Sequence, residues 1–260
     1  MQCFRNRLND FAGCDPLFEH HLSSLDVVDT DSGKAWQAVT QKGTEQQLPP
    51  ARAAVLTLPA PQLLQLKGQV QSMLKDSGVA DKLSAVQYSA RFALALWFSP
   101  DKAAPVAAAV PGAGMYVDRD SGLDVRFIAH DSAKRSVDIP GAEAGVSLVV
   151  HSSVSFGQKH LEDSKEDGGA LLLEQVKQLL PSLPEADEVK HHKWRYSQVM
   201  SAFASGTQAA GDTATSAAIV LCEDPLLILA GDSFTASNLD GCISSAEAAV
   251  SHLAKAGFTQ

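Results

Sequence analysis

Pro225-Leu-Leu-Ile-Leu-Ala-Gly-Asp-Ser-Phe-Thr-Ala-Ser-Asn-Leu-Asp-Gly-Cys-Ile-Ser-Ser-Ala-Glu-Ala-Ala-Val250 is the stretch that decides the fold. Leu226 to Ala230 is a continuous apolar run, and its length is typical of a strand that is buried on both faces. Gly231 ends the run, and a glycine allows the tight turn with which such a strand can enter a loop. The stretch therefore predicts a buried strand that continues into a polar loop.

A helix is predicted after this loop. Asp240 is a suitable N-cap, and the apolar residues that recur at helical spacing are Ile243, Ala246, Val250 and Leu253. The first N–H groups of a helix have no partner within the helix, so they favour a partially negative group or a phosphate. We therefore expect a polar ligand where Asp232 meets the N–H groups near Gly241 and Cys242.

Composition limits the classes of protein to consider. The chain has 260 residues, of which 45% are hydrophobic, and this is enough for a real core in one or two domains. Its net charge of −9 argues against nucleic acid or an anionic membrane as a partner. No apolar run reaches the roughly 18–20 residues that span a bilayer. The four cysteines are scattered without metal-ligand spacing, so we expect no metal site and a reducing, cytoplasmic location.

Strands and helices are interleaved along the chain without strict alternation. This order predicts a mixed α/β or α+β fold rather than a barrel of repeated units. Strands are expected at 22–28, 36–39, 53–58, 86–98, 123–128, 146–154, 188–199 and 226–230. Helices are expected at 4–11, from Pro61 to Gly78, at 161–180 and after Asp240, with a turn at Asp31-Ser-Gly33 and a surface insertion at 101–114.

Two short motifs invite an enzymatic interpretation. Gly112-Ala-Gly114 lacks the third glycine and the following helix of a dinucleotide-binding turn, so a simple loop explains it better. Gly231-Asp-Ser233 resembles the nucleophile block of GDSL esterases, with Ser233 as nucleophile, but no Asp-x-x-His follows it. A serine hydrolase therefore remains a remote alternative.

Two further positions are ambiguous. His151 lies inside an apolar strand pattern, which favours a hydrogen-bonded or inward-facing histidine over a catalytic one. Trp194 and Arg195 are neighbours in a predicted strand, where they either point to opposite faces or line a pocket for an aromatic or anionic ligand.

Four blocks of the sequence, in order, resemble the renalase family of the FAD-dependent amine-oxidase superfamily. They are residues 55–64, 88–96, 193–199 and 231–246. The resemblance implies a partial, Rossmann-like FAD-binding domain and a substrate domain built on a mixed sheet with helices. It assigns 1–60 and 220–260 to the FAD domain and 61–219 to the substrate domain.

The resemblance also implies a set of site residues. Asp232 would hydrogen-bond the ribityl or pyrophosphate region of FAD, and the backbone near Gly241 would face the flavin carbonyl edge. Trp194 and Arg195 would lie near the substrate. The full set of implied cofactor-binding residues is Leu22, Thr57, Pro59, Gly231, Asp232, Asp240, Gly241, Cys242 and Ile243, and none is assigned as catalytic.

Members of the family oxidise a dihydronicotinamide isomer of NAD(P)H, or an amine-like substrate, and pass the electrons to O2 to give H2O2. The family also begins with a Gly-rich turn that holds the FAD pyrophosphate, and this sequence does not contain it. We therefore expect a chain that is shortened at its N-terminus and binds FAD weakly. The alternative is a catalytically inactive relative that acts through protein contacts.

Overall fold

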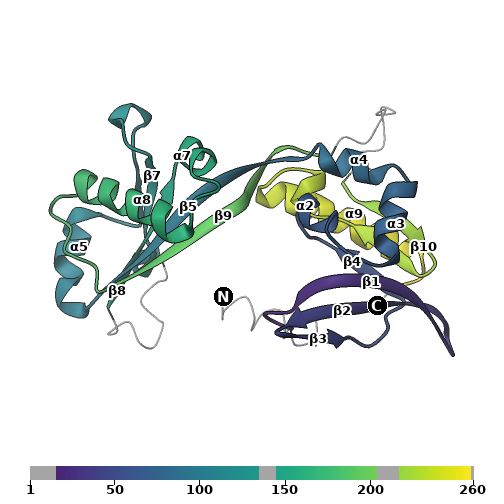
Figure 1. Cartoon of the computed structure of the whole chain (residues 1–260). Coiled ribbons are helices and arrows are strands. Elements are labelled where there is room, and N and C mark those ends of the chain that lie inside the picture. The colour runs from purple at the N-terminus through teal and green to yellow at the C-terminus, as the bar shows by residue number, and fades with distance from the viewer. Residues whose placement is uncertain (1–15, 135–144, 204–216, 259–260) are drawn as a thin grey trace. The chain divides into compact units, whose positions relative to one another are not determined.

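The computed structural model describes residues 16–134, 145–203 and 217–258. The chain divides into two compact units, Met1–Val86 with Ser201–Gln260 and Gln87–Met200 (Figure 1). Residues 61–86 and 201–219 therefore group with the first unit, although the resemblance assigns them to the substrate domain. The roles of the two units, FAD binding and substrate binding, stay predictions. The helix expected at 4–11 lies outside the described residues.

The first unit contains an antiparallel sheet of order β1-β2-β3. The predicted hairpin is confirmed, because Thr30 pairs with Gly33 on either side of the turn. Trp36 of β2 is 1% exposed, and its indole N–H reaches the carbonyl oxygens of Pro225 and Leu226 at 3.1 and 2.9 Å. The strands are β1 (His21–Thr30), β2 (Gly33–Lys42) and β3 (Thr44–Gln47).

A second sheet, of order β10-β11-β4, contains the buried strand predicted at 226–230. All four residues of β11 are buried, which confirms that prediction, and β11 pairs in parallel with β4. The strand expected at 53–58 is confirmed as β4, which is an edge strand of this sheet, and its Val55 is 38% exposed. The strands are β4 (Ala53–Leu56), β10 (Ile219–Glu223) and β11 (Leu226–Leu229), and β10 was not predicted.

The helix expected from Pro61 to Gly78 is two helices. Gly68 interrupts it with a φ of 85°, and the Asp26 carboxylate accepts a hydrogen bond from the Gln69 amide at 2.8 Å. A contact with β1 therefore overrides the local helical pattern, because Lys67 also donates its amide hydrogen to Ser23 of that strand. The helices here are α2 (Ala60–Leu63), α3 (Gln69–Asp76) and α4 (Val79–Ser84).

The last helix is α9 (Leu239–Lys255). Its N-cap is Asn238, so the expectation of Asp240 as N-cap is wrong, and the reason is that the helix begins two residues earlier. The face that packs against the sheet carries Ser245, Ala248 and Ala249. Of the apolar residues that predicted this helix, Ile243 is 46% and Val250 is 62% exposed, while Leu253 is partly buried.

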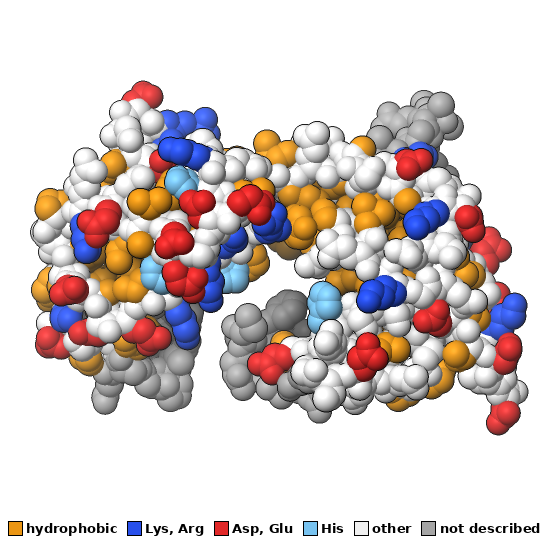
Figure 2. All heavy atoms as spheres, viewed as in Figure 1, with side chains coloured by type: hydrophobic (Ala, Val, Ile, Leu, Met, Phe, Trp, Pro, Cys, Tyr) orange, Lys and Arg blue, Asp and Glu red, His pale blue; other side chains and the backbone are white. Residues whose placement is uncertain are grey.

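The second unit is a five-stranded sheet of order β6-β7-β8-β5-β9. Helices α7 and α8 lie on one face of it (Figure 1), where Phe92 of β5 and Leu172 of α8 are fully buried in one core. Acidic and basic side chains are interspersed over this helical face (Figure 2). The strands are β5 (Gln87–Phe98), β6 (Gly114–Tyr116), β7 (Val125–His130), β8 (Val146–Ser152) and β9 (Glu188–Ser201).

The segment at 101–114 is not a surface insertion. It forms a short helix, and Val106 and Val110 are fully buried in the core of the second unit. The acidic helix expected at 161–180 begins later, because the Ser164 side chain caps it by accepting from the Asp167 amide. The helical elements are η1 (Pro100–Lys102), α5 (Ala103–Ala109), η2 (Arg119–Ser121), α6 (Asp131–Lys134), α7 (Val154–Lys159) and α8 (Lys165–Leu179). In the described ranges, no helix combines the length and the apolarity needed to cross a membrane.

Candidate functional site

The turn after β11 is held by hydrogen bonds to α9. Gly231 adopts a φ of 115° and donates its amide hydrogen to the Ser245 hydroxyl at 2.7 Å. Ser245 is 1% exposed and donates in turn to the Ala217 carbonyl at 2.6 Å. A Cβ atom at Gly231 would lie 3.4 Å from the carbonyl oxygen of Thr57, so the ends of β11 and β4 meet here. The structure thus brings together two of the predicted site residues, Gly231 and Thr57.

Asp232 begins the short helix η4 (Asp232–Phe234) immediately after this turn. It is partly buried, and its Oδ2 accepts a hydrogen bond from the Ser237 hydroxyl at 2.6 Å. An ionised carboxylate has about four acceptor positions, so one bond to Ser237 leaves others for a ligand. The carboxylate is therefore fixed in direction and still able to accept hydrogen bonds.

The N–H groups that are available at the start of α9 are not the ones expected from the sequence. The amide of Gly241 donates to the Asn238 side chain at 2.7 Å, and the amide of Cys242 donates to the Asn238 carbonyl at 3.1 Å. These two groups, expected at the flavin edge, are thus already engaged. The amides of Leu239 and Asp240, in the first turn of the helix, are the ones without an intrahelical acceptor. The donors available to a ligand therefore lie one or two residues earlier.

A cavity of about 220 Å³ lies beside the other predicted cofactor residues of the first unit. It is lined by Leu22 of β1 and by Leu58, which stands between Thr57 and Pro59. Gln62 and Lys67 add polar groups to its wall. Leu22 and Leu58, far apart in the sequence, therefore border one space, whereas Thr57 and Pro59 themselves are not part of its lining.

Trp194 and Arg195, the predicted substrate residues, do not act as a pair. Arg195 forms a bidentate ion pair with Glu162, with both N–O distances at 3.0 Å. The hydrogen bond from Arg195 lowers the pKa of Glu162, and the same bond raises the pKa of Arg195. Trp194 is 50% exposed and lies edge-on to His192, with 4.4 Å between ring centroids. Neighbours in a strand point to opposite faces, so the two side chains do not share one pocket wall. Because Arg195 is engaged by Glu162, the exposed ring of Trp194 is the member of this pair that can contact a ligand.

The exposed sheet face of the second unit carries a row of rings that the sequence analysis missed. Tyr116 of β6, Phe127 of β7 and His151 of β8 are successive partners in the strand register. The ring centroids are 4.7 Å apart between Tyr116 and Phe127 and 6.3 Å apart between Phe127 and His151. Burial lowers the pKa of His151, and the positive charges of Arg91 and Lys134 lower it further. Among the described residues, His151 is thus a half-buried member of a ring stack.

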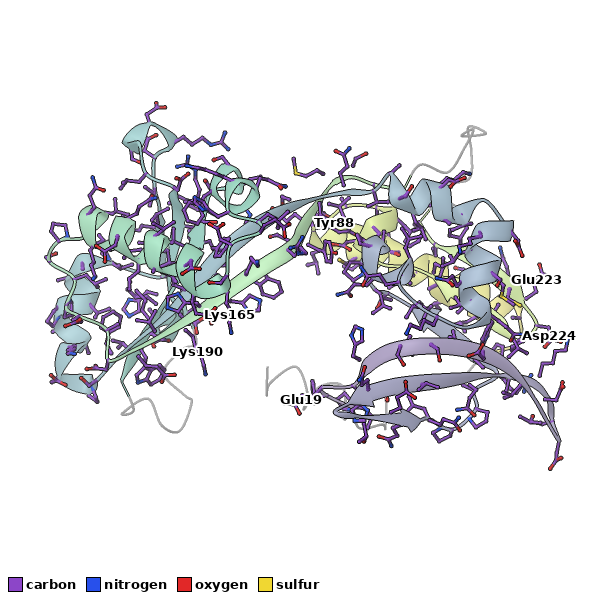
Figure 3. The ribbon with its side chains drawn as sticks, in the orientation of Figure 1. Glu19, Tyr88, Lys165, Lys190, Glu223 and Asp224 are labelled. Carbon is purple, nitrogen blue, oxygen red and sulfur yellow. The ribbon has the colours of Figure 1, made fainter. Side chains whose placement is uncertain are left out.

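Another aromatic contact lies on the same unit. Tyr88, labelled in Figure 3, lies near the start of β5. Its ring packs edge-on against Tyr196 of β9 with 5.3 Å between ring centroids. Only the register of the strands brings these rings together, so no local sequence signal could have indicated either group.

Ser233, the nucleophile of the remote hydrolase alternative, is 1% exposed. Its backbone carbonyl accepts a hydrogen bond from the amide of Phe203 at 2.8 Å, which fixes this turn against the segment that follows β9. A serine nucleophile must reach a substrate, so its burial counts against the hydrolase alternative.

The sequence is 32% identical to mouse renalase over 235 residues. The match covers 90% of this chain and 61% of the mouse protein, so the chain spans less than two thirds of that relative. No family model matches the sequence.

Solved structures share the fold at low sequence identity. A protein of Exiguobacterium sp. 255-15, named as a candidate protoporphyrinogen oxidase, gives a TM-score of 0.58 at 15% identity, over 99% of this chain and 51% of that one. A triple mutant of putrescine oxidase gives 0.55 at 11% identity, over 99% and 52%. Cyclohexylamine oxidase of Brevibacterium oxydans IH-35A gives 0.52 at 10% identity, over 90% and 48%. The chain is therefore similar in sequence to renalase over most of its own length, and it shares its mixed α/β fold with these solved oxidases.

Proposed function

We propose that this chain functions as an FAD-dependent oxidoreductase that oxidises a small molecule with O2. One observation carries the proposal: in a renalase-like sequence, the Asp232 carboxylate is held beside the start of α9 with acceptor positions to spare. The strand, loop and helix around it are joined by buried hydrogen bonds through Ser245, which makes the arrangement rigid. Rigid support of this kind is what a site for a tightly oriented cofactor requires.

The residues present fit the sugar part of FAD better than its pyrophosphate. Asp232 and Asp240 place two carboxylates near the start of α9, and their charges oppose an anion there. An ionised carboxylate can only accept hydrogen bonds, and the ribityl hydroxyls of FAD can donate them. We infer that Asp232 binds a ribityl hydroxyl, while the amides of Leu239 and Asp240 donate to the carbonyl edge of the flavin ring.

FAD, when bound, would accept a hydride from the substrate and deliver the electrons to O2, with H2O2 as product. The protein's part is to bind, to orient and to exclude water. Trp194 presents a large apolar ring with one exposed surface, on which a planar substrate can stack. A dihydronicotinamide ring, neutral and planar, is the substrate that we propose.

The activity is tested by loading the purified chain with FAD and adding a reduced nicotinamide dinucleotide isomer without oxygen. We expect the visible absorbance of the flavin to bleach, and to return with release of H2O2 when O2 is admitted. Bound flavin that stays oxidised with every dihydronicotinamide isomer would refute the substrate, and a chain that binds no FAD would favour the alternative that acts through protein contacts.

A further inference from the structure

A groove in the second unit is lined by residues that have no role in the proposed oxidation. It lies where β6 ends, β7 begins and β8 gives way to α7, and its volume is about 660 Å³. Small-molecule sites typically have volumes of about 300–1,000 Å³. Its lining includes three arginines, Arg91, Arg119 and Arg126, from three separate segments of the chain. A cationic groove is unexpected in a chain with a net charge of −9.

Two of the arginines, Arg91 and Arg126, are held in place by neutral hydrogen-bond acceptors. Arg91 donates to the Ser152 carbonyl at 3.2 Å and to the Gln198 side chain at 3.1 Å. Arg126 donates to the carbonyl oxygens of Asp118 and Leu123 at 3.3 and 3.4 Å. Among the described residues, no carboxylate forms an ion pair with any of the three guanidinium groups.

One carboxylate, that of Asp118, belongs to the lining of the groove. Its Oδ1 accepts the Asp120 amide at 2.9 Å and so caps the short helix that carries Arg119. Three guanidinium groups and one carboxylate leave the lining with a formal charge of two positive units. A phosphate monoester carries about −1.5 to −2 at neutral pH, so it balances this charge, whereas a single carboxylate does not.

The groove also has an aromatic wall. Tyr116 is 85% exposed, which is unusual for a large ring, and it rests against Phe127. The Lys134 ammonium lies 5.0 Å from the centroid of the Phe127 ring. An exposed ring beside cationic groups can stack on the flat face of a base while the cations bind its phosphate.

Two serine hydroxyls complete the polar lining. The Ser153 hydroxyl donates to the Asp124 carboxylate at 2.7 Å and lies 2.9 Å from the Ser155 hydroxyl. Ser153 gives its only hydroxyl hydrogen to Asp124, so the contact at 2.9 Å is a donation from Ser155 to Ser153. The two hydroxyls are therefore engaged with each other and with Asp124, and the charged donors in the lining are the three arginines.

We propose that this groove binds a nucleoside monophosphate, with the phosphate on Arg119, Arg126 and Arg91 and the base stacked on Tyr116. The groove shares no residue with the flavin-binding set proposed above, all of which belongs to the first unit.

The test is a calorimetric titration of the full chain with AMP, adenosine and inorganic phosphate at low salt. AMP is expected to bind at least about tenfold more tightly than either fragment, because it gains both the charged hydrogen bonds to its phosphate and the stacking of its base. Arg119→Ala and Tyr116→Ala should each weaken AMP binding by about tenfold or more. Both side chains are exposed, so the fold should survive the substitutions.

Lys190→Ala is the matched control, since it removes an exposed positive charge from the same unit outside the groove lining (Figure 3). It should change AMP affinity by no more than about twofold. No binding of AMP, or equal affinity in Arg119→Ala and Lys190→Ala, would overturn the proposal. AMP is also part of FAD, so it could bind at the flavin site instead. If FAD abolishes AMP binding and Arg119→Ala leaves it intact, AMP binds at the flavin site and the proposal for the groove is refuted. A chain that binds AMP through Arg119 but binds no FAD would refute the proposed function alone.

Discussion

The buried hydroxyl of Ser245 on α9 accepts the Gly231 amide at 2.7 Å and so fixes the turn that follows β11. The same hydroxyl donates to the Ala217 carbonyl at 2.6 Å. One side chain therefore satisfies two backbone groups at the point where strand, loop and helix meet. These two bonds explain why a polar residue, Ser245, occupies a position where α9 packs on the sheet.

Replacing Ser245 by alanine should destabilise the protein. The substitution leaves the Gly231 amide and the Ala217 carbonyl without this partner in a buried place, and each such loss costs about 1–3 kcal/mol. Ser251→Ala is the control, because Ser251 is exposed on the same helix and its hydroxyl bonds only to the Glu247 carbonyl. Urea unfolding of the two variants measures the difference, and equal free energies of unfolding would contradict the account.

Gly68→Ala should destabilise the first unit more than Gly78→Ala. Both glycines have positive φ, at 85° and 70°, so each substitution carries the cost of that backbone conformation, about 1–2 kcal/mol. At Gly68 a Cβ would also lie 2.6 Å from the Asp26 carboxylate oxygens, whereas at Gly78 it would meet open space. Thermal unfolding compares the variants. The excess cost should shrink when Asp26→Ala is added to Gly68→Ala, and an unchanged excess would exclude the clash as its cause.

Trp194 and Arg195 should respond differently to substitution. Trp194→Ala removes the exposed ring proposed to contact the substrate, so kcat/KM of the FAD-loaded protein should fall by about tenfold or more, mainly through a higher KM. Arg195→Ala breaks only the ion pair with Glu162 and should leave kcat/KM close to that of the unsubstituted protein. Steady-state kinetics separates the two, and a larger loss in Arg195→Ala would show that the guanidinium contacts the substrate.

Asp187 should make the second unit sensitive to acid. Hydrogen bonds from Lys102 and from Ser99 lower the pKa of Asp187 from 3.8 to about 2. A lowered pKa in the folded state means that the carboxylate stabilises the fold above pH 3.8, and that this contribution is lost as the pH falls from 3.8 toward 2. The pair is exposed, with an N–O distance of 2.5 Å, so high salt should weaken the effect.

Unfolding curves at several pH values test this statement. Asp187→Asn should show a smaller loss of stability than the unsubstituted protein between pH 3.8 and about 2. Asp101→Asn, in the neighbouring η1, is the charge-matched control. The interpretation fails if Asp187→Asn and the unsubstituted protein lose stability in parallel through this range.

Local signals explain the parts of the fold that the sequence predicted. The hairpin at Asp31-Ser-Gly33, the buried strand β11 and the helix after Asn238 are each specified by neighbours in sequence. The break at Gly68 was missed because it depends on Asp26, and α5 was missed because a short Ala-rich segment shows no clear period. Propensity is a weak guide where a distant side chain or a core contact decides the backbone.

The candidate site was predictable only in part, for the same reason. Resemblance pointed to Asp232, and the structure shows its carboxylate held by Ser237. The N-cap is Asn238, so the available amides are those of Leu239 and Asp240 instead of Gly241 and Cys242. The spacing of residues in the sequence did not determine which residue caps the helix. The groove of three arginines is assembled from separate segments, so it has no sequence signature.

The central claim, that Asp232 binds FAD, is tested most directly by equilibrium titration of the chain with FAD, followed by quenching of flavin fluorescence. The account predicts that the chain binds FAD and that Asp232→Ala weakens binding by roughly 10–100-fold, the effect of losing a hydrogen bond to a charged group. Glu247→Ala, an exposed acidic residue on α9, should change the affinity by no more than about twofold. Equal FAD affinity in the Asp232→Ala and Glu247→Ala variants, or no binding of FAD by the unsubstituted chain, would contradict it.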